Sequence, residues 1–396
     1  AEDENTLRTM AGEARIVRLV NDVFNRAIEL GASDIHVEPG EDSVSIRCRV
    51  DGVLAEIMNV PRSQFPAIAS RIKLIAGLNI AESRLPQDGR TNFQVGRVKL
   101  DMRVSTIPIL TGESIVLRLL NNDAVTFDLR TLGMSDRDLE QFNELIQIPH
   151  GMILVVGPTG SGKTTTLYSA LREVNVISDK LLTAEDPVEY EIEGLIQVPI
   201  NDAVGMTFHR ALRAFLRQDP DRILVGEIRD FETAQTAIEA SLTGHFVFST
   251  LHTNDAASTV TRLVDMGVEP FLISSSLAGV LGQRLIRRVC KNCKTLYTPT
   301  DDDLERLNLT REEIGDRKFC YGKGCPTCNY TGYKGRKALT ELLVVNGDIR
   351  ELISDNAPTS AIRDKAREQG MRTLREDGLA AIFNHESSVD EVVRYT

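Results

Sequence analysis

The chain contains a glycine-rich loop of the kind that holds phosphate groups. The stretch MILVVGPTGSGKTTTLYSALREV places an apolar run, 152–156, before the loop and a helix-forming segment after it. Gly157 and Gly162 let backbone amides turn toward phosphate oxygens, and the N-terminus of the following helix adds the positive end of its dipole. The spacing G-x-x-x-x-G-K-T in this context predicts a site for ATP or GTP.

Two residues of this loop have individual roles in the prediction. Lys163 is expected to reach the β- and γ-phosphates, and Thr164 is expected to bind Mg²⁺ through its hydroxyl. A coincidental glycine, serine and threonine loop is the competing interpretation, and the agreement of strand, loop and helix leaves it little weight. The expected nucleotide-binding residues of the loop are Gly157, Pro158, Thr159, Gly160, Ser161, Gly162, Lys163, Thr164 and Thr165.

Polar residues follow three further apolar runs. KLLTAEDPVEY contains Glu185, Asp186 and Glu189, RILVGEIRD contains Glu227, and HFVFSTLHTND contains His252. Helix-forming segments separate these runs, which is the β-α-β order of a parallel sheet whose ligands bind at the carboxyl ends of the strands. We therefore expect these side chains to lie beside the phosphate loop, with Glu185 and Asp186 among the nucleotide-binding residues.

Gly226 stands where the strand of most phosphate-loop NTPases ends in an aspartate that helps to hold Mg²⁺. We expect the acids of the preceding run to supply the missing charge, holding the metal through water and polarising the attacking water. Glu189 or Glu227 could act as the general base, since either carboxylate can accept a proton at neutral pH. The alternative for Glu185 and Asp186 is that they are solvated acids at a turn before a proline.

Four of the six cysteines form two Cys-x-x-Cys pairs. They are Cys290, Cys293, Cys325 and Cys328. This pattern predicts a tetrahedral Zn²⁺ site, and four thiolates leave no position for water, so the metal would be structural. Disulfides or a redox pair are the alternatives, which a reducing compartment and the repetition of the motif disfavour. Cys48 alternates with apolar residues as on a half-buried strand, and Cys320 is either a spectator or a substitute ligand.

Composition limits the class of protein. A chain of 396 residues with 42% apolar residues can bury more than one core, which favours two or three domains. The net charge of -11 and the absence of tryptophan argue against a general nucleic-acid-binding surface. No apolar run is long enough to span a bilayer and AEDENTLRT is no signal peptide, so we expect a cytoplasmic protein. The first residue is Ala rather than Met, which raises the expectation of a processed or truncated chain.

Taken together, these motifs resemble those of the type II/type IV secretion ATPase superfamily, and within it the type II secretion ATPases. GPTGSGKT, TAEDPVEY, RILVGEIRD and GHFVFSTLHTND look like its Walker A motif, aspartate box, Walker B motif and histidine box. GASDIHVEP, RVDGVL, LPQDGR and MRVSTIPILTGESIVLRLL are similar to its second N-terminal domain. The cysteine pairs are similar to the zinc segment of its assembly and secretion members. The resemblance covers nearly the whole chain.

The resemblance implies an α/β fold with a RecA-like phosphate-loop NTPase domain. A smaller α+β, PAS-like domain would precede it, and a zinc segment with four cysteine ligands and a helical C-terminus would follow. The expected divisions are 1–120 for the N-terminal domain, 121–136 for an interdomain linker, 137–286 for the ATPase core, 287–340 for the zinc segment and 341–396 for the C-terminal helices. In the last of these, Ser388 and Glu391 have the spacing of a capping box.

The resemblance also implies roles for single residues. Glu227 matches the Walker B glutamate that orients Mg²⁺ or its waters, and Glu189 matches the aspartate-box glutamate that acts as general base. His252 resembles the histidine-box sensor of the γ-phosphate. Arg103 and Arg118 are expected to reach the γ-phosphate, including that of a neighbouring subunit, where an arginine stabilises the charge of the transferring phosphoryl group. Without the resemblance, an exposed arginine is usually solvated surface.

In functional terms, the resemblance implies a cytoplasmic Mg²⁺-dependent ATP hydrolase, peripheral to the inner membrane, that drives pseudopilus assembly for type II protein secretion. It implies ATP, Mg²⁺ and Zn²⁺ as cofactors and a homohexamer that contacts inner-membrane secretion proteins, such as the cytoplasmic domain of a protein of the L type, and acidic phospholipid. The motifs barely separate this function from that of a type IV pilus assembly or DNA-uptake ATPase. A nucleic-acid motor or zinc-ribbon binding module is the alternative from another class; the charge disfavours it, and no nucleic-acid partner is expected.

Overall fold

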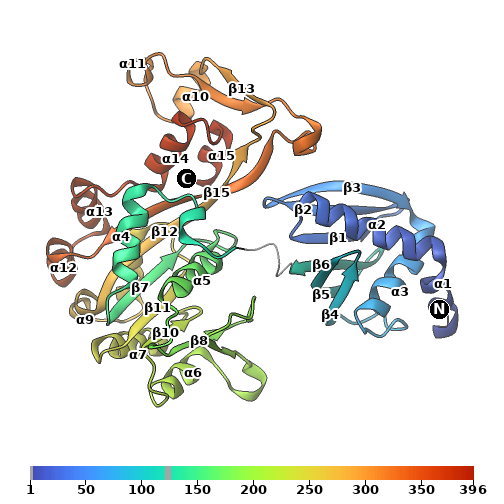
Figure 1. Ribbon diagram of the computed structural model, residues 1–396, viewed down its shortest axis with the longest axis horizontal. Helices are drawn as coiled ribbons and strands as arrows, with labels where there is room; N and C mark the ends of the chain where they lie inside the picture. Colours follow the sequence, from blue (N-terminus) through green and yellow to red (C-terminus); the bar gives the residue numbers. More distant parts are fainter. Residues whose placement is uncertain (1–2, 121–125) are drawn as a thin grey trace. The chain divides into compact units, whose positions relative to one another are not determined.

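The computed structural model describes residues 3–120 and 126–396 (Figure 1). The described residues divide into two compact units, with the division after Thr126. Residues 121–125 of the predicted linker lie outside the described residues. The rest of that predicted linker, from Phe127 to Asp136, belongs to the second unit by its contacts.

The N-terminal unit is a six-stranded antiparallel sheet with helices packed on it. The strand order is β3-β2-β1-β6-β5-β4. The strands are β1 (Asp34–Pro39), β2 (Ser43–Val50), β3 (Val53–Pro61), β4 (Gln87–Val95), β5 (Val98–Ile109) and β6 (Gly112–Leu120). The helices are α1 (Glu4–Gly12), α2 (Ala14–Leu30) and α3 (Phe65–Ile75). This is the smaller α+β domain that the resemblance implied.

Alternating apolar residues explain why these strands pack on helices. On β5, Leu100, Met102 and Val104 are at most 2% exposed, and they share a core with apolar residues of α2 and α3. The residues between them face the other side of the sheet, because successive side chains of a strand point to opposite faces. Cys48 on β2 is fully buried in the same core, so its predicted packing role is confirmed.

The second unit is built on a seven-stranded sheet in the order β15-β12-β7-β11-β10-β8-β9. Neighbouring strands from β12 to β9 are parallel, and β15 is antiparallel to β12. The strands are β7 (Gly151–Val156), β8 (Leu181–Glu185), β9 (Leu195–Pro199), β10 (Arg222–Val225), β11 (Phe246–Leu251), β12 (Leu277–Val289) and β15 (Tyr333–Val344). β7, β8, β10 and β11 are the four apolar runs that the sequence predicted as parallel strands.

Helices cover both faces of this sheet, as the α/β pattern predicted. One face packs on α4 (Asp136–Ile146) and α5 (Lys163–Val174). Six further helices cover the other face: α6 (Phe208–Phe215), α7 (Phe231–Leu242), α8 (Ala256–Asp265), α9 (Pro270–Ser276), α12 (Gly347–Ser354) and α13 (Thr359–Glu368). Strand residues alternate between the two cores, so the parallel strands are apolar on both sides.

The predicted zinc segment is an insertion between two paired strands of the sheet. β12 and β15 are antiparallel partners from Gly279↔Val344 to Val289↔Tyr333. The predicted segment 287–340 therefore begins inside β12 and ends inside β15. Between them lie α10 (Asp301–Arg306), α11 (Arg311–Ile314) and the two-stranded sheet of β13 (Lys294–Tyr297) and β14 (Phe319–Gly322).

The last two helices share a core with the inserted segment. α14 (Leu374–Phe383) and α15 (Val389–Tyr395) contribute Ile382 and Val392, which pack with Phe319 of β14 and Leu339 of β15. The predicted zinc segment and C-terminal helical region therefore bury their apolar residues together.

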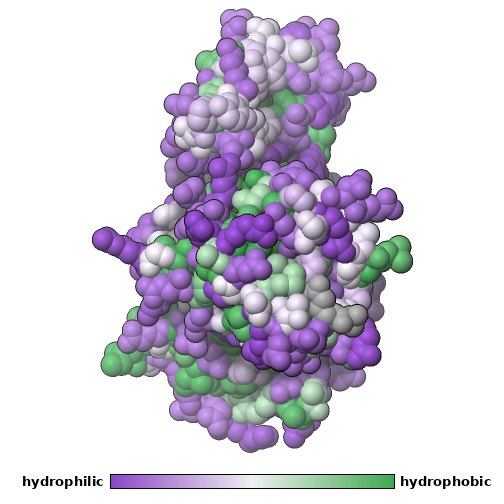
Figure 2. Space-filling model, turned by 90° about the vertical axis from the view of Figure 1, so that its right-hand side faces the viewer, coloured by the Kyte–Doolittle hydropathy of each residue, from purple (hydrophilic) through white to green (hydrophobic). Residues whose placement is uncertain are grey.

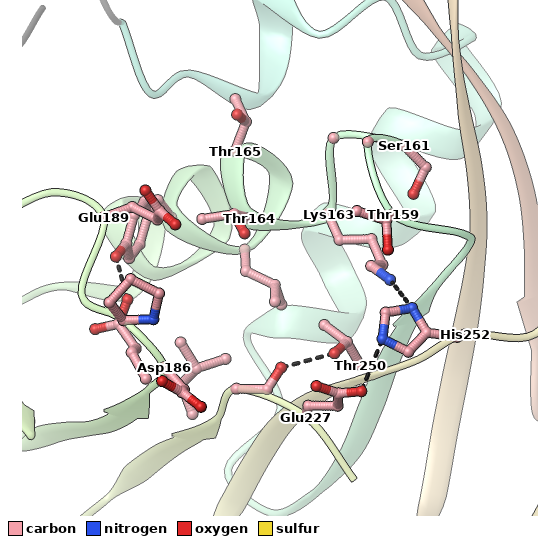
Figure 3. Close-up of a pocket in the computed structure, with 18 of the residues that line it drawn as sticks. Thr159, Ser161, Lys163, Thr164, Thr165, Asp186, Glu189, Glu227, Thr250 and His252 are labelled. Atoms are coloured by element: carbon pink, nitrogen blue, oxygen red, sulfur yellow. Dashed lines mark hydrogen bonds and ion pairs between the residues drawn. The ribbon is translucent and has the colours of Figure 1, made fainter. Parts of the chain in front are cut away.

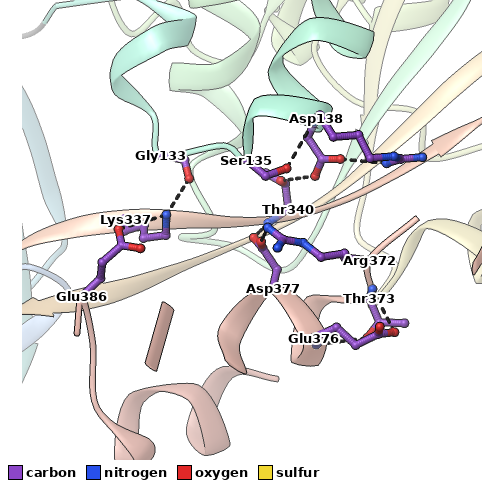
Figure 4. A network of polar contacts seen from close by, with 11 residues as sticks. Gly133, Ser135, Asp138, Lys337, Thr340, Arg372, Thr373, Glu376, Asp377 and Glu386 are labelled. Atoms are coloured by element: carbon purple, nitrogen blue, oxygen red, sulfur yellow. Dashed lines mark hydrogen bonds and ion pairs between the residues drawn. The ribbon is translucent and has the colours of Figure 1, made fainter. Parts of the chain in front are cut away.

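A buried polar network fixes the start of the second unit to β15 (Figure 4). Lys337 Nζ donates to the carbonyl oxygen of Gly133 at 2.8 Å. Thr340 donates from its hydroxyl to Asp138 at 2.6 Å and from its backbone amide to Asp377 at 2.9 Å. Thr340 and both aspartates are at most 3% exposed. One threonine of β15 thus connects α4 with α14.

Within the described residues, none of the helices has the length and apolar character needed to cross a membrane. On the face in Figure 2, apolar side chains form small groups among hydrophilic ones.

Candidate active site

A cleft of about 410 Å³ lies at the carboxyl ends of β7, β8, β10 and β11 (Figure 3). Its walls are the phosphate loop at 159–165, the acidic loop at 185–189, and residues that follow β10 and β11. This is the edge where ligands bind in open parallel sheets, and the volume falls in the range of small-molecule sites. The structure thus brings together most of the residues that the sequence predicted. Gly157 and Pro158 lie at the base of the loop, outside the cleft lining.

The phosphate loop ends in a helix N-terminus that has no side-chain cap. Gly162 is the N-cap residue of α5, with φ of 85°, and as a glycine it has no side chain to accept a hydrogen bond from the first turn of this helix. The first amides of a helix have no partner within the helix, so they are available to anionic oxygens in the cleft. Glycine suits Gly162 because φ above zero is strained for residues with a Cβ.

Lys163, His252 and Glu227 form a chain of contacts across the cleft (Figure 3). Lys163 Nζ donates to Gly157 O at 2.6 Å and lies 2.8 Å from His252 Nδ1. His252 Nε2 lies 2.7 Å from Glu227 Oε1. Since the ammonium can only donate, this arrangement fits a histidine that accepts at Nδ1 and donates from Nε2. Burial lowers the pKa of Lys163 to about 8, with Glu227 opposing the shift and Arg284 adding to it.

Glu227 is held on both of its oxygens. Arg229 Nε donates to Glu227 Oε2 at 3.0 Å, opposite the oxygen that faces His252. The same guanidinium lies 4.0 Å from Asp186 and 5.4 Å from the centre of the Phe208 ring. Arg229 therefore connects the acid after β10 with the acidic loop after β8.

Gly226 is glycine because two strands approach too closely for a side chain. A Cβ at this position would lie 2.9 Å from Ala184 O and 3.0 Å from the Phe208 ring. The Gly226 amide donates to Ala184 O at 2.8 Å, and the Thr250 hydroxyl donates to Gly226 O at 2.6 Å. An aspartate cannot be accommodated here without moving β8, so the acid of this strand end is Glu227, one residue later.

Glu185 lines the cleft, but its carboxylate is bound by protein donors. It is 6% exposed and accepts hydrogen bonds from the Tyr168 hydroxyl, from Thr183 at 2.7 Å and from Gln197 at 3.0 Å. Burial and the bond to Glu185 raise the pKa of Tyr168 above its usual range. The alternative of a solvated turn residue is wrong for Glu185, whereas Asp186 is exposed at the start of the loop.

Glu189 also lines the cleft. In Figure 3 it lies on one side of Thr164, and Glu227 lies on the other. Thr164 is exposed, and its hydroxyl-bearing side chain lines the same cleft as the two acids. A hydroxyl and carboxylates are the hard oxygen ligands that Mg²⁺ binds, so this donor set fits the metal.

Arg103 and Arg118 lie in the N-terminal unit, directly opposite each other on β5 and β6. Their neighbours Met102, Val104 and Leu117 point into the core, so both arginines point to the other face of the sheet. Arg118 lies 3.3 Å from Asp34 and its side chain is 57% exposed. Their contact with a γ-phosphate remains a prediction.

The four predicted zinc ligands converge. The sulfur atoms of Cys290, Cys293, Cys325 and Cys328 lie within 4.8 Å of one another. Three of the sulfur–sulfur distances are 3.7 to 3.8 Å. A regular tetrahedron with Zn–S bonds of about 2.3 Å has edges of about 3.8 Å, so the donor set fits Zn²⁺.

Backbone amides support these sulfurs as thiolates. Gly324 N donates to Cys293, and Gly332 N donates to Cys328, at 3.4 and 3.3 Å. All six cysteines are free of disulfides, which excludes that alternative in this structure. Cys320 is buried with its thiol 3.6 Å from Ser387 O, outside the four-cysteine group, so it is a spectator.

Several residues of the site were not predicted from the sequence. Tyr168, Gln197 and Gln283 are uncharged, and no spacing rule marks a lone tyrosine or glutamine as part of a nucleotide site. Arg229 stands in the motif RILVGEIRD, and a charged residue two positions after an acid at a strand end could have been included.

Comparisons with known proteins agree with this geometry. A family model described as "Type II/IV secretion system protein" matches residues 9–394. The chain is similar to the type II secretion system ATPase E of Vibrio cholerae, with 49% identity over 97% of this chain and 76% of that protein. It is similar to the type IV pilus assembly ATPase PilB of Thermus thermophilus, with 47% identity over 100% of this chain and 44% of that protein. Among solved structures, the Legionella pneumophila ATPase DotB has a TM-score of 0.71 and 25% identity over 94% of both chains.

Proposed function

The chain belongs to the type II/IV secretion system protein family, as its motifs predicted, and we propose that it is the ATPase that powers a type II secretion system. ATP hydrolysis follows from the family and from the ATPase relatives. The observation that carries the proposal is the cleft in which His252 contacts both Lys163 and Glu227 beside an uncapped helix N-terminus.

In the proposed reaction, water attacks the γ-phosphorus of ATP and the bond to the β-phosphate oxygen breaks, which releases ADP and phosphate. The phosphate loop and the first amides of α5 bind the phosphates, and Lys163 Nζ stabilises the charge that grows on them. Mg²⁺, when bound, neutralises phosphate charge, and Thr164 and Glu227 would hold it. His252 lies next to Lys163, where it can respond to the γ-phosphate.

The contacts of the two glutamates indicate that they have different roles. Both oxygens of Glu227 are engaged by His252 and Arg229, which suits an orienting role. We therefore assign the general base to Glu189, which accepts the proton of the attacking water. Glu185 holds the acidic loop through Tyr168, and Asp186 lines the cleft as an exposed residue.

The cellular setting forms the second part of the proposal. We propose a homohexamer in the cytoplasm, peripheral to the inner membrane, that drives pseudopilus assembly. Inner-membrane secretion proteins, including the cytoplasmic domain of an L-type protein, and acidic phospholipid are its proposed partners. In that assembly Arg103 and Arg118 would act on the γ-phosphate of a neighbour, and a zinc ion would hold the inserted segment. We propose that the N-terminal domain, the ATPase core, the zinc segment and the C-terminal helices are functional parts of this motor, with residues from Phe127 onward belonging to the ATPase unit.

Type IV pilus assembly is the second candidate. The 47% identity to a pilus assembly ATPase extends over the whole of this chain and nearly equals the identity to the type II relative. Binding to the purified cytoplasmic domain of a type II L-type protein separates the two candidates. Binding supports the type II assignment, and absence of binding with intact ATPase activity favours pilus assembly.

The ATPase itself is tested by the specific rate of phosphate release at increasing protein concentration, with Lys163→Ala as the blank. A rate per chain that rises steeply with concentration is expected if neighbouring subunits complete the site. The same series with single-stranded DNA tests the nucleic-acid motor. A concentration-independent rate that increases on addition of DNA would contradict the proposal.

A further inference from the structure

Strand β12 continues past the end of β7 and runs beside the phosphate loop. The two strands are parallel, and Gly282 of β12 pairs with Val156, the last residue of β7. Gln283 and Arg284 follow Gly282, so they lie level with the loop that leaves β7. Neither residue belongs to the motifs that predicted the nucleotide site.

The side chain of Gln283 joins the phosphate loop to the helix that follows it. Its Nε2 donates to Ser161 O at 2.9 Å, and its Oε1 accepts from the Thr166 hydroxyl at 2.6 Å. Gln283 is 1% exposed and Thr166 is fully buried. Ser161 O can only accept, so the amide orientation is fixed by its partners.

The loop also lies directly on the backbone of this part of β12. A Cβ on Gly157 would lie 2.6 Å from Gln283 O, and a Cβ on Gly162 would lie 2.8 Å from Gln283 Nε2. Gly157 is therefore required by contact with the backbone of β12 as well as by phosphate approach, whereas Gly162 lies against the side chain of Gln283. The loop therefore packs against both the backbone and the side chain of Gln283, and the hydrogen bond to Ser161 O joins them directly.

Arg284 makes the equivalent contact with the loop that carries His252. Its guanidinium donates to Asn254 O at 2.7 Å and to Gln283 O at 2.8 Å. Asn254 is two residues after His252 in the chain. On the neighbouring strand β15, Glu341 accepts from the Ala256 amide at 2.9 Å. The histidine loop, residues 252–255 between β11 and α8, is thus anchored to β12 near its middle and to β15 where α8 begins.

We propose that Gln283 and Arg284 are positioning residues for the nucleotide site: Gln283 sets the phosphate loop, and Arg284 sets the histidine loop. The two are consecutive on one strand, so β12 fixes the separation of Lys163 and His252, whose side-chain nitrogens lie 2.8 Å apart. This inference rests on the proposed function, because it assigns both loops to one nucleotide.

If Gln283 and Arg284 position different loops, replacing each one should change a different property of the enzyme. The phosphate loop binds phosphates common to ADP and ATP, so loss of the Gln283 contacts weakens the binding of both nucleotides. The histidine loop faces the γ-phosphate, which ADP lacks, so loss of the Arg284 contact leaves ADP binding intact and lowers kcat. A defect that merely destabilised the fold would not divide the effects in this way.

The test compares Gln283→Met, which keeps the side-chain volume but has no amide, with Arg284→Gln. Arg288→Gln is the matched control, since Arg288 lies on the same strand and donates to the carbonyl of Arg336 away from the cleft. Binding of ADP carrying a fluorescent methylanthraniloyl group and steady-state ATP hydrolysis are measured for each. Gln283→Met removes two buried hydrogen bonds that hold the phosphate loop, so we expect an increase of about tenfold or more in its Kd for ADP. For Arg284→Gln we expect a comparable loss in kcat with Kd within about threefold.

The outcomes distinguish this inference from the proposed function. If the parent protein fails to bind the labelled ADP, the proposed function is overturned. If the parent binds and Gln283→Met binds equally well, only the role of Gln283 is overturned. If Arg284→Gln loses ADP affinity with unchanged kcat, the division of roles is overturned. If Gln283→Met does not fold, Gln283→Glu replaces it in the test. This variant keeps an acceptor for Thr166 but has no donor for Ser161 O, so we expect the same increase in Kd. An unchanged Kd contradicts the inference.

Discussion

At the scale of single residues, Gly226 is determined by packing. Replacing it by alanine forces β10 away from Ala184 O or displaces the Phe208 ring, because a Cβ would lie 2.9 and 3.0 Å from these groups. Overpacking of this kind typically costs about 1–3 kcal/mol. We expect Gly226→Ala to lower the free energy of unfolding by that amount, as measured by urea denaturation.

Gly347 offers a matched control for this substitution. It opens α12, and a Cβ there has no neighbour within 4 Å. Gly347→Ala is therefore expected to leave stability unchanged or to raise it slightly, by the roughly 0.4–1 kcal/mol seen at unstrained positions. Equal destabilisation by both substitutions would contradict the packing account of Gly226.

Lys163 should make nucleotide binding depend on pH. Burial lowers its pKa from 10.5 to about 8, and phosphate oxygens favour the charged ammonium, so the pKa rises again when nucleotide binds. Below pH 8 the ammonium is charged in both states. Above pH 8 the free protein has lost the proton and must take it up on binding, so affinity falls as pH rises.

The measurement is the binding heat of ADP at pH 8.5 in two buffers with different ionisation enthalpies. The phosphate groups of ADP have a pKa near 6, so at pH 8.5 they are already deprotonated and take up or release no protons on binding. The difference in heat should report fractional proton uptake at pH 8.5 and much less at pH 7. Identical heats in both buffers at pH 8.5 would show that Lys163 stays charged without nucleotide.

Local sequence patterns predicted some residues of the site but not others. The phosphate loop could be predicted because strand, loop and helix are contiguous in the chain. Gln283 could not be predicted, since its partner Ser161 is 122 residues away and glutamine has no characteristic spacing.

The capping box predicted for Ser388 and Glu391 was only partly right. Ser388 accepts from the Glu391 amide at 3.3 Å, but the Glu391 carboxylate pairs with Arg287 at 2.5 Å instead of closing the capping box.

At the scale of elements, the network on β15 should contribute to stability. Thr340→Val keeps the side-chain shape but removes the donor to Asp138, which is 2% exposed. An unsatisfied buried acceptor costs about 1–3 kcal/mol. We expect a loss of that size in urea denaturation. Thr243→Val serves as the control. Thr243 is an exposed residue whose hydroxyl donates to carbonyl oxygens at the end of its own helix, α7, which water can also reach, so stability should change by less than about 0.5 kcal/mol.

The inserted segment should depend on its metal. The four cysteine sulfurs lie within 4.8 Å of one another. Cys290 and Cys293 precede β13, and Cys325 and Cys328 follow β14, so a bound metal would tie the two ends of the inserted segment together. We expect Cys293→Ser to remove the bound zinc and to open residues 290–335 to limited proteolysis. Structural zinc sites contribute directly to folding in this way.

Cys320→Ala is the matched control for the zinc prediction. Cys320 is buried in the same segment but lies outside the four-cysteine group. It should retain one zinc ion per chain by elemental analysis, and its digestion pattern should match that of the parent. Loss of zinc from Cys320→Ala, or its retention by Cys293→Ser, would contradict the ligand assignment.

Element boundaries were harder to predict than element types. The sequence indicated four parallel strands and a zinc segment, and the structure contains the four strands and the converging cysteines. It did not indicate that β12 and β15 pair on either side of the cysteines, because strands separated by an insertion carry no local signal of their partner. For the same reason, the contact between the C-terminal helices and the zinc segment was found only in the structure.

At the scale of the whole molecule, the paired arginines of the N-terminal unit provide the sharpest test. Arg103 and Arg118 face each other across β5 and β6, on the side of the sheet away from the core. In other NTPases an arginine that reaches the transferring phosphoryl group contributes about 10³-fold or more in rate. A variant with Arg103→Ala and Arg118→Ala should therefore be nearly inactive, although its own cleft is intact. Arg97→Ala, an exposed arginine in the turn before β5, should retain the parent rate.

Mixing experiments then locate the site on which these arginines act. Lys163→Ala has both arginines but lacks the phosphate contact, and the double arginine variant has the reverse defect. If the arginines act on a neighbour in a ring with head-to-tail interfaces, random mixed rings place an intact cleft beside intact arginines at about a quarter of the interfaces. We expect an equimolar mixture of the two inactive proteins to recover about that fraction of the parent ATPase rate. If the arginines act only within their own chain, the mixture stays as inactive as its components, and the proposed dependence of hydrolysis on assembly is wrong.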